Sequence, residues 1–332
     1  MSHYHHLTIE ERESLWEMRH EGKSIREIGR ALGRSPATIC RELKRNSDQG
    51  EYRPSRAEEK YRKRRKKCGA KKLLVKNKEL AETVRELIGD QQWSPEQVVN
   101  RLELEGNIRI SLNTIYRALK SGILEPKGQR RKQKGRYPLE RNLRQKNRPN
   151  GGKRGKTMFH DAPTIHERPQ AANDKSEFGH LEGDTVYCKK EKTWFVTLVD
   201  RKSLFLWTAC CRSKYEEDMT NTMTDLLSSL PEGLCKSVTL DRGSEFLCYK
   251  KVSANLGDLP FFFADPMSPW QRGLNENTNG LLRQYVPKNS YKVPFSPELL
   301  VQFTNKLNLR PRKSLGWRTP FEVLFGKVLH ST

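Results

Sequence analysis

Residues 269–287 read P-W-Q-R-G-L-N-E-N-T-N-G-L-L-R-Q-Y-V-P, and this stretch decides how the rest of the chain is interpreted. A proline at each end marks the start and the stop of a helix. At about 100° per residue, four polar side chains fall on one narrow arc, and Tyr285 with three leucines falls on the opposite side. The polar side chains are Arg272, Glu276, Asn279 and Arg283. The helix is therefore predicted to pack one face on a core and to present charged groups on the other.

A charged stripe on a helix is most often a solvated surface. This stripe is rich in asparagine, a poor helix former that a merely solvated surface would not favour. Glu276 is therefore interpreted as a functional carboxylate that acts together with residues elsewhere in the chain.

The charge of the chain is concentrated in its front half. The 332 residues carry a formal net charge of +23. Residues 1–156 hold 40 Lys and Arg against 20 Asp and Glu, whereas residues 157–332 hold 23 against 20. This distribution points to a polyanion gripped by the front half, with nucleic acid as the first candidate and a membrane surface as the second.

Neither a membrane-spanning segment nor a signal peptide is evident in the sequence. No stretch approaches the roughly 20 apolar residues of a spanning helix. The seven cysteines form no C-x-x-C pair, which suits reduced thiols. We expect a cytoplasmic, nucleoid-associated protein with no membrane partner.

Residues 1–50 are predicted to form a helix-turn-helix DNA-binding domain. Capping residues Thr8, Ser24 and Ser35 each start a short helix. The third helix is basic on its free face, which favours a DNA-reading helix over a generic three-helix scaffold. Its predicted DNA contacts are Thr38 and Arg41 on base edges, and Lys44 and Arg45 on phosphates.

Three further segments precede the back half. Residues 51–78 carry the run R-K-R-R-K-K and are predicted to be a basic helix or linker on phosphates. Residues 79–120 repeat the three-helix pattern with a less basic free face, which indicates a second helix-turn-helix-like domain. Residues 121–157 are basic and glycine-containing without periodicity, which predicts a flexible linker.

In residues 158–332 the sequence pattern differs from that of the front half, because short apolar runs are separated by turn signals. Strands are predicted over 180–188, 193–200, 204–211, 237–241 and 260–264, and helices over 215–230 and 269–287. With a helix also expected between the fourth and fifth strands, the order is three strands, helix, strand, helix, strand, helix, which is that of a ribonuclease-H-like α/β domain with a mixed five-stranded sheet. The chain is thus expected to be multidomain, with an all-α front region followed by this α/β domain.

Three carboxylates are predicted to converge in that domain: Asp184 in the first strand, Asp241 at the end of the fourth, and Glu276. Such a cluster is stable only when cations neutralise it, and oxygen ligands select Mg²⁺ or Mn²⁺. Two such ions about 3.5–4 Å apart would support phosphoryl transfer. Asp200 and Asp265 are interpreted as turn or cap residues instead.

The other members of the polar arc are predicted to contact DNA. Arg272 and Arg283 suit phosphates beside the scissile bond, because a guanidinium pairs with two oxygens at once. Asn279 would bind a base or orient Glu276, and Trp270 would stack on an unpaired base. The alternative is that the arginines pair with acids on neighbouring elements.

These residues resemble the DDE transposases of the bacterial insertion sequence thirty family, over nearly the whole chain. The resemblance is carried by S-P-W-Q-R-G-L-N-E-N-T-N-G-L-L-R-Q-Y-V-P-K, H-L-E-G-D-T-V and R-P-R-K-S-L-G-W-R-T-P-F-E-V-L, and in the front half by H-L-T-I-E-E-R and W-S-P-E-Q. It implies catalytic, metal-binding Asp184, Asp241 and Glu276 that act on the element's terminal inverted repeats. It also implies double-stranded DNA partners, both element ends and target, bound by a homo-oligomer.

Two features depart from the family pattern. Arg242 stands where the family usually has asparagine, and 34 residues separate Asp241 from Glu276, one more than usual. Two other functions remain open at this point. A ribonuclease-H-like nuclease without strand transfer shares the whole site, and a helix-turn-helix transcriptional regulator with an inactive core explains the charge but not the carboxylates.

Overall fold

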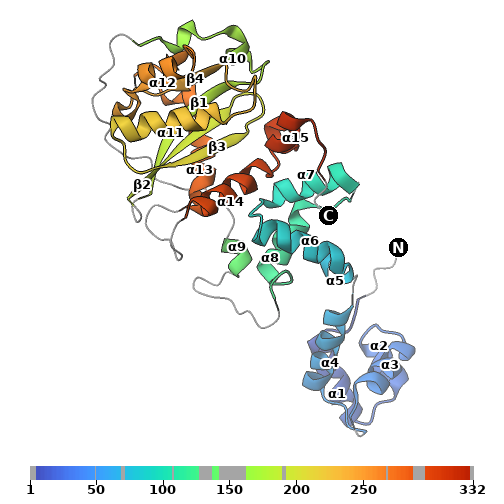
Figure 1. The fold of residues 1–332 in the computed structure, drawn as a ribbon. Helices are drawn as coiled ribbons and strands as arrows, with labels where there is room; N and C mark the ends of the chain where they lie inside the picture. Colours follow the sequence, from blue (N-terminus) through green and yellow to red (C-terminus); the bar gives the residue numbers. More distant parts are fainter. Residues whose placement is uncertain are drawn as a thin grey trace. The chain divides into compact units, whose positions relative to one another are not determined.

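The computed structural model describes residues 5–48, 50–68, 72–106, 108–126, 137–141, 162–188, 192–266, 268–286 and 296–329. The chain forms two compact units, residues 1–72 and residues 73–332 (Figure 1). Most of the predicted linker over 121–157, and Pro287, lie outside the described residues. Within the described ranges, no helix has both the length and the apolar character needed to span a membrane.

The first unit is helical where it is described. Its helices are α1 (Ile9–His20), α2 (Ile25–Ala31), α3 (Pro36–Asn46) and α4 (Pro54–Lys67). Thr8 and Ser24 each form the predicted capping box, and Ser35 caps α3. The core of the unit is apolar, with Leu15, Ile28 and Ile39 fully buried. The predicted helix-turn-helix is confirmed.

A buried arginine joins the helices of this unit. Arg12 on α1 is 1% exposed, and its Nε donates to Oε1 of Glu42 on α3 at 2.7 Å. The same guanidinium pairs with Glu58 on α4. Because a buried cation must be paired, these contacts fasten the basic helix α4 to the helix-turn-helix.

The second unit is built on a five-stranded sheet with the order β3-β2-β1-β4-β5. The strands are β1 (His180–Cys188), β2 (Thr193–Asp200), β3 (Leu206–Cys211), β4 (Ser237–Leu240) and β5 (Phe261–Phe263). β1, β2 and β3 pair antiparallel, whereas β4 runs parallel to β1, and β5 to β4. This is the predicted ribonuclease-H-like arrangement, with the first and fourth strands adjacent at the centre.

Helices cover both faces of the sheet (Figure 1). One face packs against α11 (Glu216–Ser228) and α12 (Tyr249–Asn255), and the other against α13 (Gly273–Tyr285) and α14 (Pro297–Asn308). Gly183 on β1 faces the first layer, where a Cβ would lie 2.5 Å from Cδ2 of Leu240. The neighbouring Asp184 therefore faces the second layer, toward α13.

Two predicted boundaries were wrong by a few residues. The third strand begins at Leu206 rather than 204, because Leu204 adopts a left-handed backbone (φ 61°) that closes the turn after β2. The late helix opens with a 3₁₀ turn, η4 (Pro269–Arg272), before α13 begins.

A bundle of helices belongs to the same compact unit as the sheet. It contains α5 (Leu73–Lys76), α6 (Lys78–Gly89), α7 (Pro95–Gly106), α8 (Leu112–Ser121) and α9 (Pro138–Arg141), around a core that includes Val84, Leu102 and Ile115. The remaining short elements are η2 (Ile165–Glu167), α10 (Gln170–Asp174), η3 (Ser244–Phe246), η5 (Lys313–Leu315) and α15 (Pro320–Phe325).

Arg101 on α7 fastens this bundle to the end of the chain. It is 2% exposed, and its Nη1 and Nη2 donate to both carboxylate oxygens of Glu322 on α15 at 2.7 and 2.6 Å. Glu105 pairs with the same guanidinium. Burial raises the pKa of Glu322, but hydrogen bonds from Arg101 and from two backbone N–H groups outweigh it and lower the pKa to about 2.

We predict that Arg101→Ala destabilises this unit by about 3–5 kcal/mol, because two buried carboxylates lose their cation. The measurement is urea unfolding, with Arg109→Ala as the control, since Arg109 is 81% exposed where it pairs with Glu103. The lowered pKa of Glu322 adds stability above its ordinary value near 4.5, and this stability is lost as pH falls from there toward about 2. Equal losses in the two variants would contradict the prediction.

Candidate active site

Asp184 lies in the middle of β1, and its carboxylate is held by three groups. Oδ1 accepts from the backbone N–H of Thr185 at 2.8 Å, and Oδ2 accepts from Nδ2 of Asn279 at 2.8 Å. Nη2 of Arg272 lies 3.3 Å from the same Oδ2. Burial raises the pKa of Asp184, and the nearby Arg272 guanidinium opposes this rise only in part.

Asp241 follows β4 directly and reaches the same edge of the sheet. In the parallel pairing, Glu182 lies opposite Thr239, so Asp184 and Asp241 each stand two residues further along. Oδ2 of Asp241 lies 3.4 Å from Nη1 of Arg272, and its Oδ1 accepts from the N–H of Gly243 at 3.0 Å. One guanidinium thus bridges the two predicted catalytic aspartates.

Of the three predicted carboxylates, Glu276 is the one that does not join the other two. It lies on α13, four residues after Arg272 and three before Asn279, both of which contact Asp184, but its own side chain is exposed. Over the described ranges, no group of three or more His, Cys, Asp or Glu side chains is placed to hold a metal ion. The structure therefore brings two of the three carboxylates together.

The sequence reasoning missed a further carboxylate, that of Glu245. Its Oε1 accepts from the Thr185 hydroxyl at 3.2 Å, which ties the loop after β4 to the strand that carries Asp184. The loop folds back tightly over Gly243, where a Cβ would lie 2.8 Å from Oε2 of Glu245 and 2.9 Å from Oδ1 of Asp241. The only signal in the sequence was the short spacing D-R-G-S-E. This segment shows neither a helical nor a strand period, so the sequence does not indicate where the side chain of Glu245 points.

The remaining residues of the polar arc lie along the same side of α13. Asn279 hydrogen-bonds Asp184 rather than Glu276, and its Oδ1 accepts from the Thr197 hydroxyl at 3.2 Å. Nη2 of Arg283 donates to the carbonyl of Tyr187 at 2.8 Å. Trp270, in the turn before the helix, is 74% exposed. The predicted DNA contacts of these residues stay predictions.

The other acids and the unusual arginine have structural partners. Asp200 closes the turn after β2, where its Oδ2 accepts from the N–H of Ser203 at 2.7 Å. Asp265 contacts His166 and Gln271, each at 2.8 Å. Nε of Arg242 donates to the carbonyl of Ala264 at 3.1 Å, which directs this side chain toward the end of β5.

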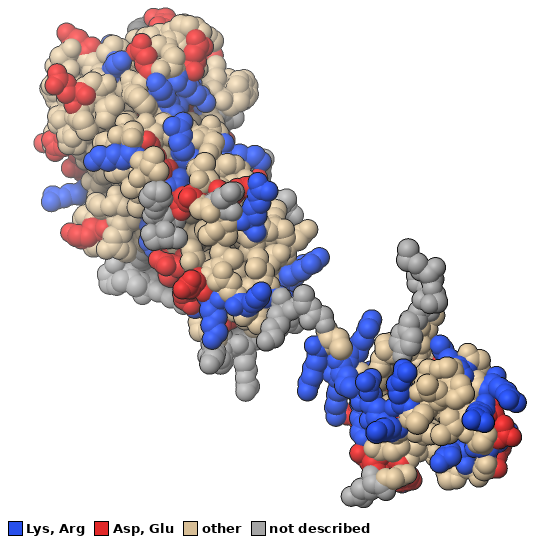
Figure 2. Space-filling view, turned by 90° about the vertical axis from the view of Figure 1, so that its right-hand side faces the viewer, with Lys and Arg blue, Asp and Glu red and all other residues tan. Residues whose placement is uncertain are grey.

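The predicted DNA-reading helix α3 presents a basic surface. Arg41, Lys44 and Arg45 are exposed, whereas Thr38 is half-buried, with its hydroxyl 2.8 Å from that of the capping Ser35. Figure 2 shows Lys and Arg side chains gathered over the unit that contains α1 to α4. The exposed basic residues of α4 are Arg56, Arg62, Lys63, Arg65, Lys66 and Lys67.

Helix α8 repeats the local design of α3. Residues 35–44 read S-P-A-T-I-C-R-E-L-K and residues 111–120 read S-L-N-T-I-Y-R-A-L-K, with six of ten positions identical. Ser111 caps α8 through the N–H of Thr114 at 3.2 Å, the same distance as between Ser35 and Thr38. Arg117 and Lys120 are exposed, as are Arg41 and Lys44 at the matching positions.

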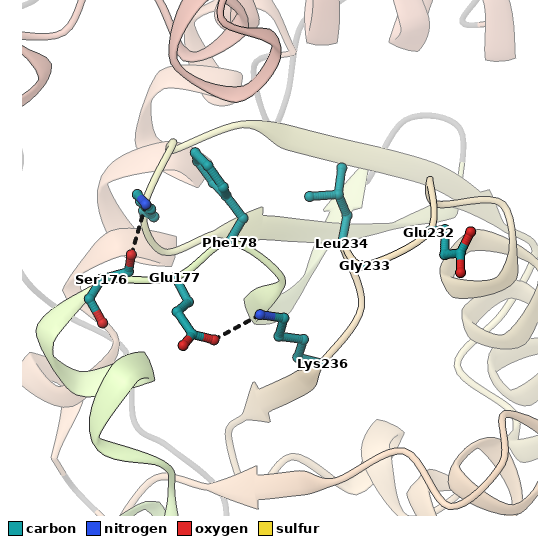
Figure 3. A pocket seen from close by; sticks show the side chains of 8 residues that line it. Ser176, Glu177, Phe178, Glu232, Gly233, Leu234 and Lys236 are labelled. Carbon is teal, nitrogen blue, oxygen red and sulfur yellow. Dashed lines mark hydrogen bonds and ion pairs between the residues drawn. The ribbon is translucent and has the colours of Figure 1, made fainter.

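A shallow hollow of about 370 Å³ lies away from the aspartates (Figure 3). It is lined by Ser176, Glu177, Phe178, Lys202, Glu232, Gly233, Leu234 and Lys236. Phe178 and Lys236 precede β1 and β4, so the hollow is at the opposite end of these parallel strands from Asp241. Nζ of Lys236 already pairs with Glu177 at 2.7 Å, and the hollow takes no part in the site.

Comparisons with known proteins agree with this architecture. A family model described as a helix-turn-helix domain matches residues 3–46. The chain is 37% identical to the transposase InsI for insertion sequence element IS30A of Escherichia coli (strain K12), over 96% of this chain and 83% of the relative. It is 34% identical to the transposase for insertion sequence element IS1086 of Cupriavidus metallidurans, over 97% and 94%.

Among solved structures, the catalytic core domain of BIV integrase aligns with 44% of this chain and 94% of its own, with a TM-score of 0.36 and 16% identity. These relatives define the class of protein as a transposase. The chain belongs to the insertion sequence thirty family of these enzymes.

We predict that Glu245→Ala slows DNA cleavage more than Glu245→Gln does. The amide oxygen of glutamine still accepts from the Thr185 hydroxyl, whereas alanine frees the loop that carries Asp241. The lost hydrogen bond is worth about 1 kcal/mol, or roughly fivefold in rate. Cleavage rates on labelled DNA ends, with thermal melting to verify folding, provide the measurement. Equal losses would mean that the charge of Glu245 matters rather than its hydrogen bond.

Proposed function

We propose that this transposase binds the terminal inverted repeats of an insertion sequence and catalyses metal-dependent DNA cleavage and strand transfer. The observation that carries the proposal is the convergence of Asp184 and Asp241, from neighbouring parallel strands, on a single cationic group. The helix-turn-helix at the front of the chain and the relatives named as insertion-sequence transposases support the DNA substrate.

The donor set fits a hard divalent ion. Asp184 and Asp241 already share a cation, the guanidinium of Arg272, and carboxylate oxygens are the ligands that Mg²⁺ and Mn²⁺ prefer. Asp184, Asp241 and Glu276 would hold two such ions. When bound, the ions supply activation of the attacking oxygen and stabilisation of the leaving oxygen.

The chain's own residues prepare this site. The N–H of Thr185 and the amide of Asn279 hydrogen-bond different oxygens of Asp184 and so fix the plane of its carboxylate. Burial raises the pKa of Asp184, and the Arg272 guanidinium and the hydrogen bond from the Thr185 N–H oppose this rise because both favour the charged form. Thr197 in turn holds the amide of Asn279. The carboxylate is therefore oriented before any substrate arrives.

DNA contacts are proposed on three surfaces. On α3, Arg41 reads base edges with Thr38, while Lys44 and Arg45 bind phosphates. Near the aspartates, Arg272 and Arg283 bind phosphates beside the cut, and Trp270 and Asn279 contact bases. Helix α8 is a second DNA-facing helix, supported by its repeated sequence and its exposed Arg117 and Lys120. The enzyme acts as a homo-oligomer on DNA in the cytoplasm.

We predict that Asp184→Asn, Asp241→Asn and Glu276→Gln each abolish cleavage and leave binding of element ends intact. An amide has the same shape but lacks the charge that holds divalent ions. The measurement is cleavage of labelled ends in Mg²⁺, beside gel shifts of the same DNA. A variant with near-normal cleavage would exclude its residue from the site.

The same assay distinguishes the proposed function from its competitors when a plasmid target is added. A transposase joins the labelled ends to the plasmid. A nuclease cuts the ends and joins none, and a regulator with an inactive core binds the ends without cutting them.

We predict that Arg41→Ala lowers the preference for cognate over random DNA by about 1–3 kcal/mol, since Arg41 is exposed on the free face of α3. Competition gel shifts measure this preference, with Arg45→Ala as the phosphate-contact control. That control should weaken both DNAs alike and reduce the salt dependence. Equal loss on both DNAs in Arg41→Ala would assign Arg41 to phosphates.

A further inference from the structure

Arg272 occupies the space between the two aspartates. Its side chain is 11% exposed, and its Nη2 and Nη1 lie 3.3 Å from Asp184 and 3.4 Å from Asp241. Nη1 also lies 3.4 Å from the carbonyl of Gly183. Within the described residues, this guanidinium contacts only oxygens of the carboxylate edge, which is where a divalent ion shared by the two aspartates would bind.

A divalent ion and this guanidinium compete for the same oxygens. Both are cations, and two cations within a few ångströms repel each other strongly in a part-buried site. Oδ2 of Asp184 is contacted by Arg272 and also by Asn279, so it has little remaining capacity for a third partner. The arginine must therefore move away from the aspartates when a metal ion is bound between them.

We propose that Arg272 is a positioning residue that holds Asp184 and Asp241 together in the metal-free enzyme and gives up its place to the incoming metal ion. The inference rests on the proposed metal-dependent function. The released guanidinium then binds a phosphate of the DNA end, for which its two parallel donors are suited. Arg272 thereby links metal loading to DNA engagement, because a phosphate that draws the arginine away opens the site to metal.

The link is thermodynamic and can be measured without turnover. If DNA and metal each displace the same contact, then each must raise the affinity for the other by an equal factor. In the wild-type enzyme, Mn²⁺ should bind more tightly when a duplex carrying the element end is present. In Arg272→Ala, the metal site is already open, so the DNA-dependent gain should disappear.

The experiment is Mn²⁺ binding followed by electron paramagnetic resonance, with and without the duplex. Without DNA, Arg272→Ala should bind Mn²⁺ about tenfold more tightly than wild type, since a competing charge is gone. Arg272→Lys keeps the positive charge but lacks the guanidinium that bridges the two aspartates. Its affinity for Mn²⁺ should lie between those of wild type and Arg272→Ala. In the measurements without DNA, Arg283→Ala is the matched control for metal affinity, because Arg283, on α13, donates to the backbone carbonyl of Tyr187.

Melting temperatures give an independent readout that does not depend on DNA. In EDTA, Arg272→Ala should melt below wild type, because Asp184 and Asp241 face each other without a cation; Mn²⁺ should raise its melting temperature more than that of wild type. Unchanged or weaker Mn²⁺ binding in Arg272→Ala, with wild-type binding that depends on Asp184, would overturn this inference alone. Wild-type protein that binds no Mn²⁺ with or without DNA would remove the proposed function as well.

Discussion

The parallel pairing of β1 with β4 is the constraint on which the site depends. It spans three residue pairs, from His180 with Ser237 to Glu182 with Thr239, and it sets the two aspartates level with each other. The register cannot slip by one residue, because a slip would turn Asp184 toward the face where Gly183 now meets Leu240 without room for a Cβ. The same glycine that lets the sheet pack therefore also fixes which face carries the carboxylate.

The helix that faces this edge is held at both ends. Just before its beginning, Arg272 contacts both aspartates, and at its end the Tyr285 hydroxyl donates to the carbonyl of Gln91 at 3.1 Å. Asn279, in the middle of the helix, hydrogen-bonds Asp184. Arg310 strengthens the second connection, since it donates to Gln284 on α13 and to Gln97 on α7. The bundle that contains α8 is thus connected to the carboxylate edge through one helix. DNA bound by α8 would therefore have a set position relative to the aspartates.

Local signals in the sequence predicted the elements well, and long-range contacts account for what it missed. Capping residues such as Thr8 and Ser24 act within four residues, and the bounds of β1 and β2 follow from short apolar runs bounded by turn signals. The contact between Arg101 and Glu322 joins residues 221 positions apart, and no pattern in either neighbourhood announces it. The position of Arg272 was open for a related reason. Its place on the polar arc was clear, but the arc favoured a phosphate as its partner and left an acid on a neighbouring element as the alternative. The β1–β4 pairing brings Asp184 and Asp241 to the edge that Arg272 faces.

The charge at the edge explains why the site is built with a cation of its own. Asp184, Asp241, Glu245 and Glu276 bring four negative charges to this edge and to the helix facing it, and Arg272 brings one positive charge. Burial makes the negative charge on Asp184 costly unless it is compensated. After the positive charge of Arg272 is counted, three negative charges remain. Two divalent ions would exceed these by one positive charge. A single phosphate would then restore neutrality. In the proposed function, metal ions or a DNA phosphate alone would leave this edge charged, and the two together would balance it. The exposed position of Glu276 is consistent with this balance, because before the ions arrive a fourth carboxylate would only add repulsion.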